Sequence, residues 1–167
     1  MPSVADAALV SEATAYRYFP DLVSLLREAD AGMWPSPAES LAPVSDTADP
    51  VERIGYATEV LLRRVLGYES AVRAMIAGSI TRPPVAAERP GHRFGLIDHA
   101  LAPFAATLSQ PRIAELEQLR RDLAVVMSAE ALFILTDLCG LSADEAVASA
   151  VQTAKTLTTA MVRTLQR

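Results

Sequence analysis

Residues 4–19 read VADAALVSEATAYRYF, and this stretch decides the fold that we expect. Small and apolar side chains over residues 3–8 have helical spacing, and residues 12–18 have the pattern of a second short helix. Ser11 precedes the second helix and can cap it by accepting a backbone N–H group. The pattern therefore predicts a helix-turn-helix with Leu9 in the turn.

The second of these short helices carries the side chains that suggest chemistry. We expect Val10 and Phe19 to point inward and residues 14–18 to share an exposed surface. Hydroxyl groups and a guanidinium on such a surface suit phosphate oxygens and guanine edges of DNA. The same pattern also fits an ordinary helical corner with two tyrosines at the surface, so the residues alone leave both interpretations open.

The rest of the chain is predicted to be helical. Apolar spacing follows the helical period, and no period-two alternation indicates a strand, so we expect an all-α fold. Proline-rich residues 35–50 and 82–91 are expected to be loops. The expected helices cover residues 22–30 after a cap at Asp21, then 51–66, 68–80, 93–108 with a kink at Pro103, 111–138, and 143–165.

The last two expected helices carry the densest apolar surface. Gly140 between them suits a left-handed helix end, and Ser142 with Glu145 forms a capping box for the last helix. Such helices need partners on both sides. One side faces the chain's own core, and the other faces either the same hairpin of a second subunit or more of that core. The candidate dimer-interface residues are Val147, Ala150, Val151, Ala154, Thr158 and Met161.

Composition is typical of a globular protein. The chain has 167 residues, of which 51% are hydrophobic, yet no apolar run approaches the ~20 residues of a membrane-spanning helix. A single cysteine, Cys139, excludes an internal disulfide and a cysteine-based zinc site, so we expect a cytoplasmic protein with no membrane partner. Residues 1–34 contain two basic and five acidic side chains, a net charge of −3, which disfavours binding to a polyanion.

No motif predicts catalysis, a metal or a cofactor. The sequence has no Gly-rich phosphate loop and no nucleophile elbow. His92 and His99 lie seven residues apart, but no nearby Cys or Glu completes the usual set of metal ligands. We therefore expect neither an enzyme nor a bound metal, and no cofactor.

A pocket for a small molecule is expected among the helices between residues 51 and 138. Aromatic residues make up only 5% of the chain, so such a pocket would be mainly aliphatic and its ligand mainly hydrophobic. The candidate lining residues are Arg53, Tyr56, Arg73, Met75, His99, Phe104 and Met127.

Residues 10–21, VSEATAYRYFPD, resemble the recognition-helix signature of the tetracycline-repressor (TetR) family of bacterial transcription regulators. Residues 4–8 resemble the end of the family's second helix, residues 93–103 its seventh, and the final hairpin its dimerising pair. The sequence departs from the pattern at Leu9, which replaces a turn glycine, and at residues 21–23, which lack the usual lysine. The matching positions are Val10, Ser11, Thr14, Tyr16, Tyr18 and Phe19.

The resemblance implies an all-α homodimer. Residues 1–34 would form an incomplete helix-turn-helix head that begins inside the family's second helix. Residues 35–167 would bind a small, mainly hydrophobic effector and dimerise through the last two helices. The implied function is a ligand-responsive regulator, most simply a repressor.

The same resemblance assigns roles within the head. Ser11, Thr14, Tyr16 and Tyr18 would contact phosphates, and Arg17 would reach base edges. Operator DNA would need the complete head, so we expect the 167-residue chain to bind DNA weakly or not at all. The alternative is a dimeric small-molecule-binding or interaction module that no longer binds DNA.

Overall fold

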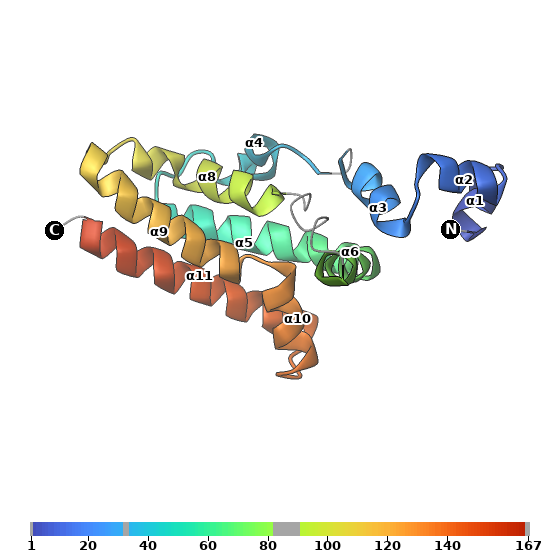
Figure 1. The fold of residues 1–167 in the computed structure, drawn as a ribbon. Helices are drawn as coiled ribbons and strands as arrows, with labels where there is room; N and C mark the ends of the chain where they lie inside the picture. Colours follow the sequence, from blue (N-terminus) through green and yellow to red (C-terminus); the bar gives the residue numbers. More distant parts are fainter. Residues whose placement is uncertain (1, 32–33, 82–90, 166–167) are drawn as a thin grey trace. The chain divides into compact units, whose positions relative to one another are not determined.

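The computed structural model describes residues 2–31, 34–81 and 91–165, and every regular element within these ranges is a helix (Figure 1). The expected all-α class is therefore confirmed. The chain divides into two compact units, residues 1–34 with 69–90 and residues 35–68 with 91–167. The division after Trp34 falls at the expected boundary, whereas residues 69–90 join the first unit rather than the second.

The first unit is built from short helices. Helix α1 packs on α2, and α3 packs on α6. The expected cap at Asp21 is confirmed, because its Oδ1 accepts the N–H of Ser24 at 2.8 Å. Its helices are α1 (Pro2–Ala7), α2 (Glu12–Tyr18), α3 (Leu22–Ala31) and α6 (Glu69–Thr81).

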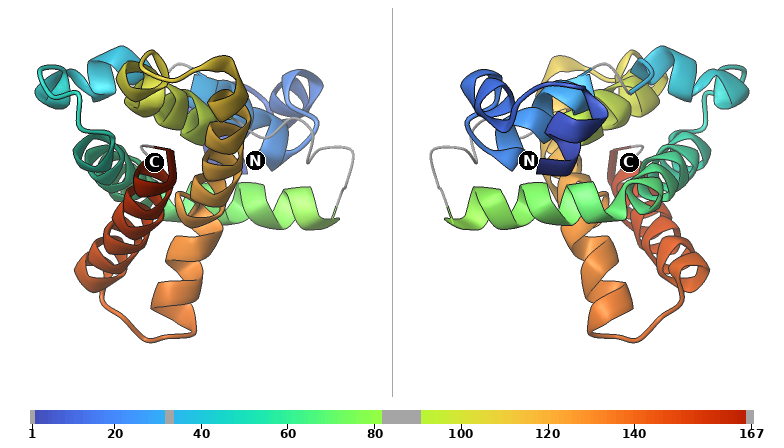
Figure 2. Two further views of the ribbon diagram at one scale, coloured as in Figure 1. Left: turned by 90° about the vertical axis from the view of Figure 1, so that its left-hand side faces the viewer. Right: turned by 90° about the vertical axis from the view of Figure 1, so that its right-hand side faces the viewer.

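The second unit is a helical bundle (Figures 1 and 2). Helix α5 packs on α8 and α11, and α9 packs on the same two helices, so these four surround a common core. Fully buried side chains such as Leu62, Ile97, Leu123 and Val147 fill it. The elements are α4 (Pro37–Ser40), the 3₁₀ helix η1 (Ala42–Val44), α5 (Pro50–Gly67), α8 (His92–Ala105), α9 (Gln110–Val126), α10 (Ala129–Asp137) and α11 (Ala143–Leu165).

Two expectations about these elements are wrong. Residues 111–138 form two helices rather than one, because the hydroxyl of Ser128 donates to the Val125 carbonyl at 2.7 Å and accepts the Ala131 N–H at 3.0 Å. Ser128 thereby closes α9 and caps α10. Residues 35–50 are not all loop, since Ser36 and Glu39 form a capping box for α4 with proline in its first turn.

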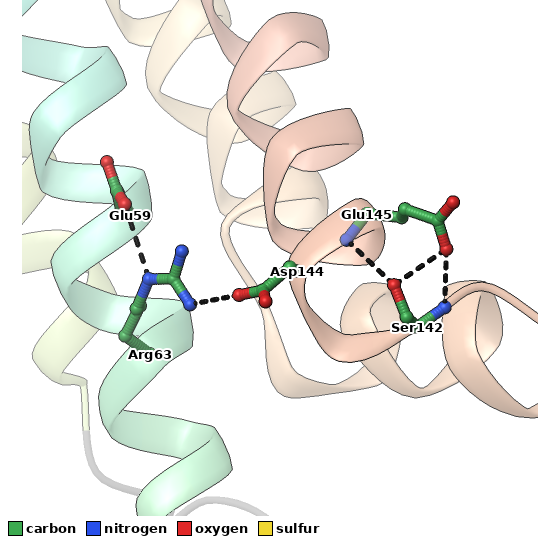
Figure 3. Close-up of polar contacts among 5 residues, drawn as sticks. All are labelled: Glu59, Arg63, Ser142, Asp144 and Glu145. Atoms are coloured by element: carbon green, nitrogen blue, oxygen red, sulfur yellow. Dashed lines mark hydrogen bonds and ion pairs between the residues drawn. The ribbon is translucent and has the colours of Figure 1, made fainter.

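The start of α11 confirms the capping box expected there (Figure 3). A carboxylate oxygen of Glu145 accepts the N–H of Ser142 at 2.9 Å and its hydroxyl at 2.6 Å. Arg63 of α5 donates to Asp144 at 2.6 Å and to Glu59 at 3.3 Å, which ties α5 to the first turn of α11. The hydrogen bond to Asp144, followed by the one to Glu59, raises the pKa of Arg63.

None of the helices in the described ranges has the length and apolar character needed to cross a membrane.

Candidate functional site

The turn between α1 and α2 is set by two backbone hydrogen bonds. The N–H of Val10 donates to the Ala5 carbonyl at 3.0 Å, and the N–H of Leu9 donates to the Asp6 carbonyl at 3.1 Å. This pair of bonds is the Schellman motif, which ends a helix through one residue in the left-handed conformation. Leu9 is that residue, with φ of 55°. The structure thus forms the left-handed turn expected of the motif, with leucine where glycine is usual.

The left-handed backbone of Leu9 costs conformational free energy, and burial of its side chain does not offset this cost. A left-handed φ costs a non-glycine residue roughly 1–2 kcal/mol, because Cβ approaches the following carbonyl oxygen. The Leu9 side chain is 93% exposed, so it gains no burial in return. Strain held at an exposed turn is a feature found at functional sites.

Ser11 begins α2, as the sequence predicts. Its Oγ accepts the N–H of Thr14 at 3.1 Å and lies 2.8 Å from the Thr14 hydroxyl oxygen. Two residues differ from expectation. Ala15 is buried at the contact with α1, because small side chains allow the two short helices to meet there, and Val10 is 41% exposed, because it leaves α1 beyond the left-handed residue.

The exposed side of α2 presents Tyr16, Arg17 and Tyr18. Tyr18 is 67% exposed, Tyr16 is also exposed, and the Arg17 guanidinium lies 5.5 Å from the centre of the Tyr18 ring. Tyrosine hydroxyls donate well to phosphate oxygens, and a guanidinium can leave an exposed ring to reach a base edge. The five residues expected to bind DNA all lie on α2 or directly before it, and none of them is buried: Ser11, Thr14, Tyr16, Arg17 and Tyr18.

The expected effector residues belong to both units of the chain. Arg73, which pairs with Glu69 at 2.8 Å, and Met75 lie on α6 of the first unit. Met127 is fully buried in the core of the second unit, and Phe104 is buried on α8. Tyr56 is half-buried on α5.

Arg53 is a structural residue rather than a ligand-facing one, contrary to the sequence expectation. It is only 4% exposed, and its guanidinium donates to the backbone carbonyls of Ala100 and His99 at 3.0 Å each. It also reaches the carbonyls of Val44 at 2.7 Å and Thr47 at 3.3 Å. These bonds use the donors that an effector would need.

Four of the six residues expected at the dimer interface are buried within the chain. They are Val147, Ala150, Ala154 and Thr158, on α11 where it packs against α5 and α9. A second copy cannot reach them in this conformation. For these four residues the expectation is wrong, because the helical period identifies a buried face without identifying the neighbour. Val151 and Met161 are half-buried.

A pocket of about 380 Å³ lies at one end of the bundle. Sequence reasoning named only Phe104 among its lining residues. The signal available for the others was the helix start around residues 109–111, where Ser109 stands before a proline. The lining residues are Phe104, Thr107, Leu108, Ser109, Arg112 and Leu165.

Comparison with known proteins finds no family model, no curated protein and no solved structure that matches this chain. The function is therefore inferred from the chain's own residues and geometry.

Proposed function

We propose that the protein is a ligand-responsive transcriptional regulator of the TetR type, acting as a homodimer. In this proposal α2 reads operator DNA and the helical bundle binds a small effector. The observation that carries the proposal is the left-handed turn at Leu9, which joins α1 to α2 and leaves Tyr16, Arg17 and Tyr18 accessible.

The groups on α2 are suited to phosphate contacts. The Ser11 and Thr14 hydroxyls lie 2.8 Å apart, so one donates to the other and the remaining proton is free for a phosphate oxygen. The two tyrosine hydroxyls add further donors. Such contacts fix the position of a reading helix, and Arg17 is the side chain that can discriminate among bases.

Charge sets the expected strength of this binding. Residues 1–34 have a net charge of −3, and Arg17 is the cation on the exposed side of α2. Each phosphate neutralised by a cation adds about −0.9 to the slope of log affinity against log salt concentration. With about one such contact per subunit, binding to DNA is weak and shows a shallow salt dependence.

The homodimer is proposed to form through α10 and the outer face of α11. Ile134 of α10 and Leu138, the C-cap residue of that helix, lie four residues apart and are both exposed, with Leu138 at 80%. Neighbours at this spacing share one face of a helix. Exposed apolar side chains gathered on one face are typical of an association surface.

A titration followed by NMR tests the reading helix even when affinity is weak. The isotope-labelled chain is titrated with a 20-base-pair duplex at low salt, and amide shifts are followed for residues 11–18. We expect the shifts to concentrate on α2 and to be reduced severalfold by Arg17→Ala. Arg163→Ala removes an exposed arginine from α11 and is the matched control.

The outcomes separate two functions. Shifts on α2 that need Arg17 support a DNA-reading role. Shifts that spread over the whole chain contradict this role. Shifts on α2 that Arg163→Ala reduces as much as Arg17→Ala does also contradict it. A complete lack of shifts favours the second candidate, a dimeric ligand-binding or interaction module without DNA binding. The net negative charge of residues 1–34 supports this candidate.

A further inference from the structure

The pocket at the end of the bundle lies entirely in the second unit. Residues of the turn between α8 and α9 line it together with Leu165 of α11. Figure 1 shows this turn and the end of α11 at the same end of the bundle. The turn is held by backbone bonds from Thr107 to Phe104 at 2.9 Å and from Leu108 to Ala105 at 3.1 Å. The pocket has a volume of about 380 Å³, which corresponds to ~13 water molecules at ~30 Å³ each. A small organic molecule fits this space.

Among the described residues that line the pocket, Arg112 is the one with a charge. Its backbone N–H donates to the Ser109 carbonyl at 2.9 Å, which fixes Arg112 in the first turn of α9. Within the described ranges no carboxylate or carbonyl pairs with its half-buried guanidinium. A guanidinium without a partner in a concave site favours an anion that can accept two hydrogen bonds side by side.

The other lining groups divide into hydroxyls and apolar surface. Ser109 stands before α9, yet its hydroxyl makes no capping bond and is free to donate to a ligand. The Thr107 hydroxyl already donates to the Phe104 carbonyl at 2.7 Å. Phe104, Leu108 and Leu165 form a small apolar wall, since Phe104 and Leu165 are buried and expose little surface.

We propose that this pocket binds a small monocarboxylate with an apolar body. The carboxylate lies against Arg112 and Ser109, and the body lies against Phe104, Leu108 and Leu165. One guanidinium balances one negative charge, whereas a phosphate dianion would keep a second charge without a partner. Only the step that makes this ligand the effector rests on the proposed function.

Octanoate and the neutral 1-octanol are the probes, titrated into the full chain by calorimetry and NMR. Arg112→Met removes the charged hydrogen-bond donor, so it weakens octanoate binding about tenfold or more. Binding of 1-octanol changes by less than about twofold, because it uses only the apolar wall. Arg112→Lys retains part of the octanoate affinity, since it keeps the charge and loses the paired donors.

Arg121→Met is the matched control, because Arg121 is an exposed arginine of the same helix and does not line the pocket. It leaves octanoate binding unchanged, and octanoate shifts the methyl resonances of Leu108 and Leu165. The proposal is overturned if octanoate does not bind, if Arg112→Met and Arg121→Met weaken it equally, or if the shifted methyl groups lie elsewhere. No DNA is present in this experiment, so its failure is distinct from a failure of DNA binding.

Discussion

The guanidinium of Arg53 donates to the backbone carbonyl of His99 at 3.0 Å, and His99 lies four residues before Pro103 in α8. Proline has no N–H group, so the carbonyl four residues earlier loses its helical partner. Arg53 therefore supplies from α5 the donor that Pro103 removes from α8. It bonds the adjacent Ala100 carbonyl as well, at 3.0 Å. A buried cation and a proline within a helix thus compensate for each other.

Arg53→Met tests this compensation. The change leaves the His99 and Ala100 carbonyls without their side-chain donor, and we expect it to lower the free energy of unfolding by about 2–4 kcal/mol. Pro103→Ala restores a backbone N–H that can bond to His99. Arg53→Met should therefore lower the free energy of unfolding by about 1 kcal/mol less in the Pro103→Ala background than in the parent chain. Urea unfolding of the parent, the two single variants and the double variant measures this difference. Equal costs in both backgrounds would contradict the compensation.

Leu9→Gly is expected to stabilise the turn between α1 and α2. Glycine adopts the left-handed φ at no steric cost, so we expect a gain of roughly 1 kcal/mol, seen as slower amide hydrogen exchange in α1 and α2. Gly140→Ala is the reciprocal control. Gly140 has φ of 69°, and an added Cβ there would meet no atom within 4 Å. We therefore expect Gly140→Ala to lower stability through the backbone conformation alone. A Leu9→Gly chain that exchanges faster than the parent would contradict the assignment.

Glu145 gives a prediction for acid pH. The hydrogen bond from the Ser142 hydroxyl, followed by the one from its N–H, lowers the pKa of Glu145 below its ordinary value of 4.5. The folded state thus favours the carboxylate, so this stabilisation is present above about pH 4.5 and is lost as pH falls through the lowered pKa. Ser142→Ala should raise the pKa of Glu145 in an NMR titration.

The capping box of α4 provides an internal control for that titration. The Ser36 hydroxyl, followed by its N–H, lowers the pKa of Glu39 in the same way. Ser142→Ala should leave Glu39 unchanged. A parallel shift of both carboxyls would indicate a general change in the fold instead of a lost cap.

The proposed dimer surface on α10 can be tested by charge. Ile134→Asp combined with Leu138→Asp should convert a dimer into a monomer in light scattering, because association would bury two new charges. Both side chains are exposed, so the fold of each subunit should persist. Ile80→Asp introduces a charge at an exposed isoleucine of α6 and should leave the dimer intact. Dissociation by Ile80→Asp alone would place the surface elsewhere.

Local signals in the sequence were sufficient for elements whose ends are marked by caps. The sequence correctly places three residues at helix ends, namely Ser11, Ser142 and Gly140. Each serine caps a helix with its own side chain, and the glycine adopts the left-handed backbone conformation. Ser128 was missed, since it lies in an apolar stretch without glycine or proline, and only its bonds to Val125 and Ala131 reveal the break.

Roles that depend on distant partners could not be predicted in the same way. The charge of Arg53 suggested a ligand contact, but carbonyls from η1, from the loop after it and from α8 occupy its guanidinium. The small residues of α11 suggested a dimer seam, yet α5 and α9 of the same chain cover four of them. Arg112 was not identified as a pocket residue, because its pocket also needs the turn after α8 and the end of α11, which are distant in the sequence.

The central claim is that a homodimer reads DNA through α2, and selection from randomised duplexes tests it most directly. The chain at micromolar concentration and low salt is used to select 30-base-pair duplexes, which are then sequenced. We expect a weak enrichment of an inverted repeat, because a two-fold dimer presents α2 twice with one cation on each copy, and we expect Arg17→Ala to abolish it. Enrichment of no sequence, or the same sequences with Arg17→Ala as with the parent chain, would contradict the claim.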